Sequence, residues 1–349
     1  DRRRTLARVH LGGGTPTALA PDQLERLWDA IESCFQLAPD AERAVEVDPR
    51  VTTEDHLRCL GALGFRRLSV GVQDLDPGVQ AAIGRIQSYA ETVAVVDGAR
   101  RHGFTSLNID LVYGLPRQTP ASFSSTIEAI VKLRPERVAA FAFAYLPDAL
   151  PLQRRLPVAD MPSPAARVAL RAQVAEALES RGYVAIGMDH WALPDDDLAV
   201  ALAERRLWRD FQGYTTRRAR ETIGVGTSAI SDIGGVYAQN ALGLSEHRQA
   251  VYAGELATHK GFLRTREDEL RREVILGLLC NLWVDLAAID AGGFAEERAA
   301  LQPLVDDGLL AIDGDQLTVT ERGRPFLRNI ASVFDAHLTT APGRFSSSV

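Results

Sequence analysis

The chain has 349 residues, of which 46% are hydrophobic and 24% are charged, and 39 basic against 46 acidic side chains give a net charge of −7. This composition is typical of a globular protein with one large core or two smaller ones, and no apolar run reaches the roughly 18 residues of a membrane-spanning helix. The acidic balance lacks the broad cationic field that binds a phosphate backbone, so the sequence argues against both nucleic acid and a membrane as partners.

Short β-branched runs alternate with longer amphipathic segments over the first 190 residues. The predicted strands are Leu6–Leu11, Arg43–Val47, Leu68–Val72, Leu107–Val112, Val138–Tyr145 and Tyr183–Met188. The predicted helices are Pro21–Phe35, Thr53–Gly64, Tyr89–Gly103, Ser122–Leu133 and Pro164–Gly182. Five repeats at near-regular spacing predict an α/β fold with a parallel sheet that forms part of a (β/α) barrel, with its chemistry at the carboxyl ends of the strands.

The pattern changes after about Gly235. The predicted elements are the helices Glu267–Trp283, Leu286–Gly292 and Phe294–Asp307, the hairpin strands Leu309–Asp313 and Gln316–Val319, and a last helix, capped by Thr320, that runs to about Leu338. Three helices and a hairpin resemble a winged-helix module. The third helix is too acidic to read DNA, so we expect a structural lid.

Four segments follow from this reading. Residues 1–235 form the partial barrel, 236–261 a connecting segment, 262–338 the mostly helical, winged-helix-like lid, and 339–349 a disordered polar tail.

The three cysteines predict a reducing, cytoplasmic setting. Cys34, Cys59 and Cys280 are 25 and 221 residues apart in sequence, which matches neither a metal-ligand pair nor a disulfide framework. Each lies on an apolar face of a predicted helix, so we expect all three to pack in the core and none to ligate a metal.

The strongest local signal is Gly12-Gly13-Gly14-Thr15-Pro16-Thr17, directly after the first predicted strand. Three glycines remove every Cβ, so the backbone can lie against a ligand. A Lys-Ser/Thr pair does not follow, which argues against a nucleoside triphosphate. A purely structural turn is the alternative.

Polar residues recur at the ends of the next predicted strands. They lie in Glu46-Val47-Asp48-Pro49, Gly71-Val72-Gln73-Asp74, Asn108-Ile109-Asp110 and Tyr113-Gly114-Leu115-Pro116. Any one of these could be a helix cap or a salt bridge. Together they predict a site at the mouth of the barrel, because a packed barrel core excludes polar groups.

Two weaker signals favour structural roles. Gly224–Ala229 has the letters of a dinucleotide-binding fingerprint, but a charged stretch precedes it where a strand is required. We expect instead a glycine-supported loop that closes over the barrel mouth, with Ile230 as an apolar contact. His190 follows a predicted strand and is expected to have a structural role.

Together these motifs, with Phe211-Gln212-Gly213-Tyr214-Thr215-Thr216, resemble the oxygen-independent coproporphyrinogen III oxidases, which are radical S-adenosylmethionine enzymes. The resemblance extends to about Leu338. The Met188–Ala199 segment and Tyr237-Ala238-Gln239-Asn240 favour the oxidase over the related haem-chaperone branch.

The resemblance implies an incomplete radical-SAM-type barrel and an oxidoreductase of haem and porphyrin biosynthesis. In this family 5′-deoxyadenosyl radicals remove hydrogen from two propionates of coproporphyrinogen III, which lose carbon dioxide and become the vinyl groups of protoporphyrinogen IX. It also implies an electron donor such as flavodoxin or ferredoxin and a monomeric protein.

The resemblance also assigns site residues. Gly13 and Glu46 would contact the S-adenosylmethionine at the cluster, and Ile230 would pack on it. A second S-adenosylmethionine would be surrounded by Gly14, Thr15, Gln73, Arg85, Asp110 and Ala144. In this second site, Arg85 and Asp110 would face the carboxylate and the ammonium of one amino-acid group. Gln212 would be the catalytic polar residue at the reacting propionate.

One departure from the family concerns the 4Fe-4S cluster. The family holds it in a Cys-x3-Cys-x2-Cys loop after the first barrel strand, and this sequence contains no such motif. We expect that a segment before Asp1 carries it, and that the chain alone is inactive.

Two other functions are left open: a non-catalytic tetrapyrrole carrier and another radical enzyme acting on tetrapyrroles. The sequence also leaves open which arginines hold the propionates, with Arg117, Arg217, Arg218 and Arg220 as candidates.

Overall fold

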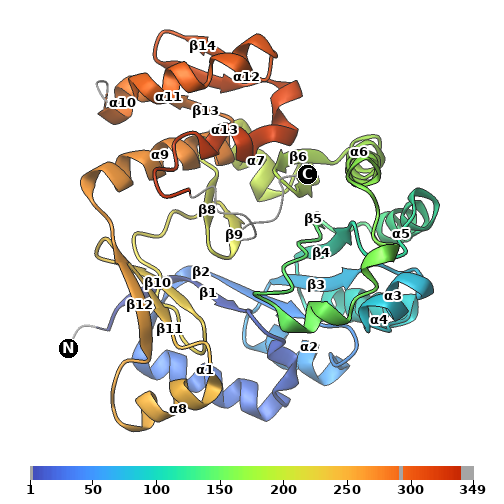
Figure 1. Cartoon of the computed structure of the whole chain (residues 1–349). Helices are drawn as coiled ribbons and strands as arrows, with labels where there is room; N and C mark the ends of the chain where they lie inside the picture. Colours follow the sequence, from blue (N-terminus) through green and yellow to red (C-terminus); the bar gives the residue numbers. More distant parts are fainter. Residues whose placement is uncertain (1–2, 291–293, 339–349) are drawn as a thin grey trace. The chain divides into compact units, whose positions relative to one another are not determined.

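A computed structural model describes residues 3–290 and 294–338. They form two compact units, the first extending to Val200 and the second beginning at Ala201, and each is described by itself (Figure 1). The predicted tail, 339–349, lies outside the described residues. Residues 201–235 belong to the second unit, whereas the predicted barrel extends to residue 235. The predicted domain boundaries stay a prediction.

The first unit is built on a seven-stranded sheet of order β1-β2-β3-β4-β5-β7-β6. Its strands are β1 (Thr5–Leu11), β2 (Gln36–Val47), β3 (Arg67–Gln73), β4 (Ser106–Tyr113), β5 (Arg137–Ala142), β6 (Val184–Gly187) and β7 (His190–Ala192). Strands β1 to β5 are parallel neighbours, and β7 runs antiparallel to both β5 and β6. The carboxyl ends of β1 to β5 therefore meet at one edge.

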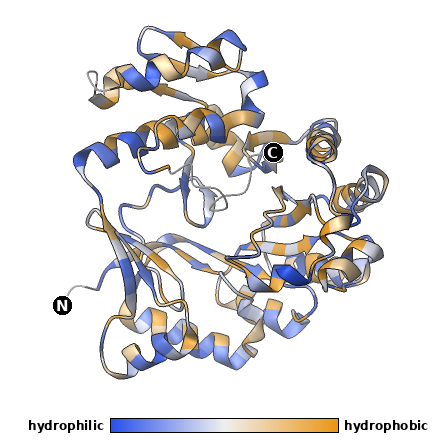
Figure 2. Cartoon of the chain, viewed as in Figure 1, coloured by the Kyte–Doolittle hydropathy of each residue, from blue (hydrophilic) through white to orange (hydrophobic). Residues whose placement is uncertain are grey.

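Helices connect the parallel strands β1 to β5, as the alternating pattern predicts, and two further helices follow β5. They are α1 (Pro21–Cys34), α2 (Glu54–Ala62), α3 (Pro77–Ile83), α4 (Tyr89–Arg101), α5 (Pro120–Lys132), α6 (Pro164–Glu179) and α7 (Asp197–Ala203), with short 3-10 turns η1 (Pro16–Ala18), η2 (Pro151–Arg155) and η3 (Val158–Asp160). One face of the sheet packs on these helices through buried residues such as Val70, Ile109 and Phe123. Figure 2 shows apolar residues in β3, β4 and β5 and alternating apolar and polar residues along the helices beside them.

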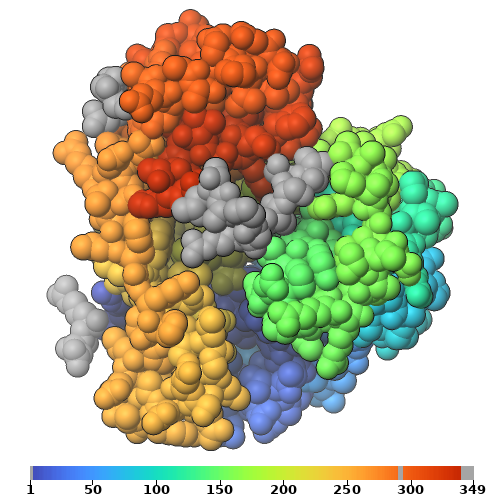
Figure 3. Space-filling model, in the orientation of Figure 1, coloured from blue at the N-terminus to red at the C-terminus, as the bar shows by residue number. Residues whose placement is uncertain are grey.

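The second unit begins with the hairpin β8 (Trp208–Asp210) and β9 (Gly213–Thr215). An antiparallel sheet follows, formed by β10 (Ile230–Ile233), β11 (Val236–Asn240) and β12 (Thr258–Leu263), with α8 (Leu244–Tyr252) between its last two strands. Every residue of β12 is exposed, and Figure 3 shows α8 and β12 at the surface. An exposed strand carries no apolar alternation, which explains why the sequence did not predict it.

The remainder of the second unit is mostly helical. Its elements are α9 (Arg266–Asn281), α10 (Leu286–Asp290), α11 (Ala295–Ala300), α12 (Gln302–Asp306), η4 (Glu321–Phe326) and α13 (Leu327–Ser332), with a sheet of β13 (Trp283–Asp285), β14 (Leu310–Asp313) and β15 (Gln316–Val319). The predicted hairpin is confirmed as β14 and β15. It gains β13 as a third strand.

Several predicted elements differ from the structure. The single helix predicted over Phe294–Asp307 is wrong, because Pro303 lies in the first turn of a separate helix, α12, where its missing N–H costs nothing. Thr320 does cap the last helical segment, but this begins as a 3-10 helix containing Pro325 and ends at Ser332. The helix predicted over Leu286–Gly292 ends at Asp290 among the described residues. Strand β5 ends at Ala142, three residues before the predicted end.

Two of the three cysteines are buried as predicted. Cys59 lies in the core of the first unit and Cys280 in α9 of the second. The prediction for Cys34 is wrong: it is the last residue of α1 and is exposed, because the chain turns directly into β2.

Candidate functional site

One face of the parallel sheet carries a row of polar side chains. Neighbouring strands place Glu46 of β2 beside Ser69 of β3, and Ser69 beside Asn108 of β4, with Asp110 two residues further along β4. These side chains are only partly buried, whereas the residues that alternate with them pack into the core on the other face. A row of this kind at the carboxyl ends of parallel strands is typical of a binding site in a barrel.

The glycine loop lies against Glu46. Nε2 of His10 is 3.0 Å from Oε1 of Glu46, and the backbone N–H of Gly13 donates to Oε2 at 3.2 Å. A Cβ at Gly12 would lie 2.6 Å from both Glu46 Cδ and His10 Nε2, so a larger residue here would have to displace the ends of these two side chains and disturb their contact. Gly13 has a positive φ of 79°, and a Cβ on Gly13 or Gly14 would meet nothing within 4 Å, so the loop is open on that side.

The carboxylate of Glu46 is held in its ionised form. Burial alone would raise its pKa, but the contacts with His10 and the Gly13 N–H outweigh burial and lower the pKa below its ordinary value. Glu46 therefore presents a negative charge and free acceptor capacity at the open loop.

Asp110 accepts two hydrogen bonds from the polar row. Ser69 Oγ donates to Oδ2 at 2.9 Å, and Asn108 Nδ2 donates to Oδ1 at 2.7 Å. Burial raises the pKa of Asp110 to about 6 and the charge of Glu46 adds to the rise, although the hydrogen bonds from Ser69 and Asn108 oppose it. A cation placed here would remove much of the cost of ionising Asp110.

Arg85 lies beside the end of β3. Its Nη2 donates to the carbonyl of Gly71 at 2.7 Å, and its Nη1 is 3.0 Å from Oδ2 of Asp48. Asp48 also accepts from Nε and Nη2 of Arg50, at 3.0 and 2.7 Å. Burial favours the neutral carboxyl group, but Arg50 and then Arg85 outweigh it and hold the pKa of Asp48 below its ordinary value. Nε of Arg85 is buried and has no hydrogen-bond partner among the described residues.

The end of β3 has an irregular backbone. Gln73 has a φ of 69°, at a break in the register between β3 and β4. The next residue, Asp74, is fully buried and accepts from Gln118 Nε2 at 2.6 Å, Thr126 Oγ1 at 2.8 Å and the Asp76 N–H at 2.8 Å. This buried network fixes the loop that carries Gln73.

The remaining predicted site residues of the first unit are at the same edge of the sheet or follow it. Thr15 precedes η1 in the glycine loop, and Ala144 follows β5, where its carbonyl accepts from Gln153 Nε2 at 3.0 Å. His190 lies in β7 with its ring edge-on to Phe141 at 5.5 Å, in agreement with a structural role.

Gln212 and Ile230 belong to the second unit. Gln212 is exposed in the turn between β8 and β9, and its backbone N–H donates to Asp210 Oδ1 at 2.8 Å. Ile230 begins β10. The loop before it is held by Asn240, whose Nδ2 donates to the carbonyl of Gly226 at 2.8 Å. Because a strand follows this loop instead of a helix, the loop is not a dinucleotide-binding turn.

The sequence did not predict two kinds of site residue. His10 is the first, because only the pairing of β1 with β2 places it beside Glu46. The second comprises two polar neighbours of the charged groups, Arg50 and Ser69. Their partners Asp48 and Asn108 lie within the motifs noted at the strand ends, and alternation along β3 could have indicated Ser69.

The described residues do not fit an iron–sulfur cluster. They contain no group of three or more His, Cys, Asp or Glu side chains placed to hold a metal ion. Cys59 is buried in the first unit and Cys280 in the second, and burial raises the pKa of the Cys280 thiol to about 12. Over the same residues, the structure contains no helix long and apolar enough to cross a membrane.

Comparisons with known proteins agree with the fold. Residues 1–130 match the model of the Radical SAM superfamily, and residues 265–326 match that of the HemN C-terminal domain. The oxygen-independent coproporphyrinogen III oxidase of Escherichia coli K12 is 44% identical over 342 residues, which cover 96% of this chain and 75% of that protein. The protein of the same name from Bradyrhizobium diazoefficiens is 42% identical over 98% of this chain and 77% of its own length.

A solved structure confirms the predicted fold class. Coproporphyrinogen III oxidase (HemN) from Escherichia coli, described as a radical SAM enzyme, matches with a TM-score of 0.93 and 44% identity, over 96% of this chain and 79% of that one. The radical SAM superfamily implies S-adenosylmethionine and a 4Fe-4S cluster as cofactors. By these matches, this chain belongs to the oxygen-independent coproporphyrinogen III oxidase family of radical SAM enzymes.

Proposed function

We propose that the chain provides the cofactor- and substrate-binding parts of an enzyme that converts two propionates of coproporphyrinogen III into the vinyl groups of protoporphyrinogen IX. Each propionate loses a hydrogen atom, carbon dioxide and one electron in this conversion. The observation that carries the proposal is the polar row from the glycine loop through Glu46 to Asp110. It lies in a chain that is 44% identical to the oxygen-independent coproporphyrinogen III oxidase of Escherichia coli K12.

The residues present fit S-adenosylmethionine. The ligand carries an ammonium, a carboxylate, a sulfonium and ribose hydroxyls, so it needs acceptors, a guanidinium and close approach of backbone. Glu46 and Asp110 are acceptors, Arg85 has a buried Nε without a partner among the described residues, and Gly13 and Gly14 are open to a ligand. When bound, S-adenosylmethionine supplies the group that accepts the hydrogen atom from the substrate.

We assign one molecule of S-adenosylmethionine to Gly13 and Glu46, with Ile230 as an apolar contact. His10 supports this assignment because it holds one oxygen of Glu46 while the Gly13 N–H holds the other, which fixes the carboxylate at the loop. The carboxylate would accept hydrogen bonds from the ammonium or the ribose hydroxyls.

A second molecule is assigned to Gly14, Thr15, Gln73, Arg85, Asp110 and Ala144. Asp48 and the Gly71 carbonyl orient Arg85, and Ser69 with Asn108 orients Asp110. Arg85 would bind the carboxylate of the amino-acid group and Asp110 would bind its ammonium or a ribose hydroxyl.

Gln212 is assigned to the reacting propionate, which it would hold by hydrogen bonds from its exposed side-chain amide. Its position in a two-residue turn between β8 and β9 supports the assignment, because the hairpin fixes the backbone while the side chain stays free. We further propose a monomeric, cytoplasmic protein that receives electrons from a flavodoxin or ferredoxin. The buried Cys59 and Cys280 agree with a reducing setting.

The test is an anaerobic assay of a holoenzyme that contains this sequence and a reconstituted cluster. We expect protoporphyrinogen IX and two molecules of carbon dioxide per coproporphyrinogen III, with S-adenosylmethionine consumed. Cleavage of S-adenosylmethionine without formation of vinyl groups would contradict the substrate assignment. Binding of coproporphyrinogen III without cleavage, in an enzyme with a full complement of iron, would favour the tetrapyrrole carrier.

A further inference from the structure

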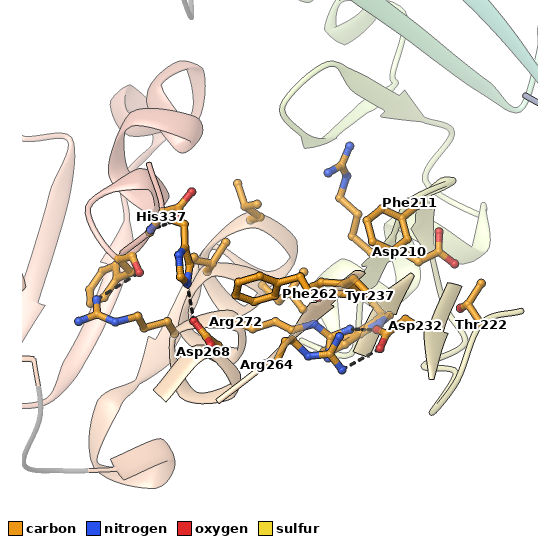
Figure 4. Close-up of a pocket in the computed structure, with 18 of the residues that line it drawn as sticks. Asp210, Phe211, Thr222, Asp232, Tyr237, Phe262, Arg264, Asp268, Arg272 and His337 are labelled. Atoms are coloured by element: carbon orange, nitrogen blue, oxygen red, sulfur yellow. Dashed lines mark hydrogen bonds and ion pairs between the residues drawn. The ribbon is translucent and has the colours of Figure 1, made fainter. Parts of the chain in front are cut away.

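The second unit contains a cavity of about 390 Å³, within the range of small-molecule sites. Its apolar wall includes Ile275, Leu276 and Leu279 of α9, and aromatic rings cover other sides. Figure 4 shows the rings of Phe211, Tyr237 and Phe262 at this cavity, with Phe211 edge-on to Tyr237 at 5.4 Å between ring centroids. The cavity therefore suits a ligand with a flat apolar body.

Most arginines that line this cavity are already neutralised. Arg264 and Arg272 share the carboxylate of Asp232, at 2.7 and 2.9 Å, as the dashed lines of Figure 4 mark. Arg271 is 2.7 Å from Glu297. These ion pairs hold the walls together and leave little of their charge for a ligand.

Arg209 differs from these three. It lines the same cavity, is partly buried, and has no ion-pair partner among the residues that the structure describes. Its Nε is buried without a hydrogen-bond partner. The guanidinium lies 5.7 Å from the ring centroid of Tyr214, at the outer limit of a cation–π contact. A half-buried, unpaired guanidinium beside apolar walls favours a ligand carboxylate.

The hairpin connects Arg209 with the residue assigned to the substrate. Arg209 of β8 pairs with Tyr214 of β9, and Gln212 lies in the turn between them. Two of the arginines noted in the sequence are less suitable. Arg218 is paired with Glu273 and covers the ring of Trp208 at 4.1 Å, and Arg117 is 2.8 Å from Asp160.

We propose that this cavity is a subsite for a propionate-bearing pyrrole ring, in which Arg209 binds the carboxylate and the aromatic walls contact the ring. The inference rests on the proposed function, because that function names a substrate with such rings. It assigns Arg209 to substrate binding and leaves the reacting propionate to Gln212.

The test measures binding of two porphyrins to the full chain from the change in their main absorption band. The first is coproporphyrin III, which has four carboxylates, and the second is its uncharged tetraamide. The variants are Arg209→Gln and Arg209→Lys, with Arg322→Gln as the control. Arg322 is an exposed arginine of the same unit and does not line the cavity.

We expect Arg209→Gln to weaken binding of coproporphyrin III by about 10- to 100-fold, since a charge-assisted hydrogen bond is lost. Binding of the tetraamide should not change. Arg209→Lys should be intermediate, because lysine keeps the charge but lacks the planar fork of donors. Arg322→Gln should leave both affinities unchanged.

A second variant tests the cavity itself. Ala219 is exposed and lines the cavity, so Ala219→Trp adds a large ring without disturbing a core. It should weaken binding of both porphyrins. The proposal is overturned if Arg209→Gln binds coproporphyrin III as tightly as the unmodified chain, or if folded Arg209→Gln loses both porphyrins equally. It is also overturned if Ala219→Trp changes neither affinity.

These measurements need neither cluster nor reductant. Carboxylate-selective binding without turnover would therefore contradict the proposed function and keep the subsite. Turnover by the holoenzyme, together with unchanged porphyrin binding in Arg209→Gln, would contradict the subsite and keep the proposed function.

Discussion

Replacement of Asp110 by asparagine separates what this carboxylate costs in stability from what it contributes to binding. Asparagine has nearly the same shape and cannot ionise. The hydrogen bonds of the site can adapt to it: the Oδ1 of Asn108 has no partner among the described residues, and the hydroxyl of Ser69 can rotate to accept instead of donate. We therefore expect Asp110→Asn to fold.

The pKa of Asp110 gives the size and the sign of the effect. Burial raises it from an ordinary value of 3.8 to about 6, and a difference of about 2 pH units corresponds to about 3 kcal/mol. Because the folded-state pKa is the higher one, the contribution of Asp110 to stability is fully present below pH 3.8 and is lost as the pH rises through 6. At pH 8 the ionised carboxylate thus costs the free protein at most about 3 kcal/mol.

The assay is thermal unfolding at pH 4.5 and pH 8. The Tm of Asp110→Asn relative to the unmodified chain should be higher at pH 8 than at pH 4.5, by up to about 6 to 12 °C for a unit of this size. Comparing the two proteins at each pH removes the titration of all other groups. A Tm difference that is the same at both pH values would refute the reasoning.

Binding should change in the opposite direction. Loss of a charge-assisted hydrogen bond should weaken S-adenosylmethionine at the second site by about 10- to 150-fold, and turnover of the holoenzyme should fall with it. Unchanged binding in a variant that is more stable at pH 8 would remove Asp110 from the site.

Three further predictions follow from the glycine loop, the cysteines and the C-terminal helices. Gly12→Ala should lower the free energy of unfolding by about 1–3 kcal/mol, because its Cβ would meet the side chains of Glu46 and His10. Gly14→Ala is the control and should not lower it, because the space around its Cβ is open. Equal Tm values for the two variants would contradict this prediction. The chain supplied anaerobically with iron and sulfide should bind no stoichiometric 4Fe-4S cluster, and about four irons per chain with a cluster absorption band would disprove it. Residues 262–338 should not bind duplex DNA, so a salt-sensitive, sub-micromolar gel shift would be the contrary result.

The alternation of short apolar runs with amphipathic segments was enough to predict the parallel part of the sheet. Leu107–Val112, for example, lies within β4 and differs by one residue at each end. Buried apolar residues of this strand alternate with partly exposed ones along its whole length, so its period-2 signal is strong. Short elements were missed: α3 has seven residues and β7 has three, too few for a periodic pattern.

The charged residues at the strand ends could be predicted, whereas their partners could not. Glu46 and Asp110 interrupt apolar runs, which a sequence shows directly. The contact of His10 with Glu46 depends instead on the register of β1 against β2, where Leu11 pairs with Val45. The cavity around Arg209 is formed by three segments, residues 208–237, 262–279 and 334–337, which only the tertiary structure brings together.

The most direct test of the account is a calorimetric titration of this chain with S-adenosylmethionine. The double variant Glu46→Gln/Asp110→Asn removes both carboxylates of the polar row, and Glu25→Gln/Asp29→Asn makes the same charge change at two exposed positions of α1. We predict saturable binding to the unmodified chain and to the α1 variant, and loss of at least about 10-fold in affinity in the double variant of the polar row. Equal affinities in all three proteins would contradict the assignment of the strand edge as the cofactor site.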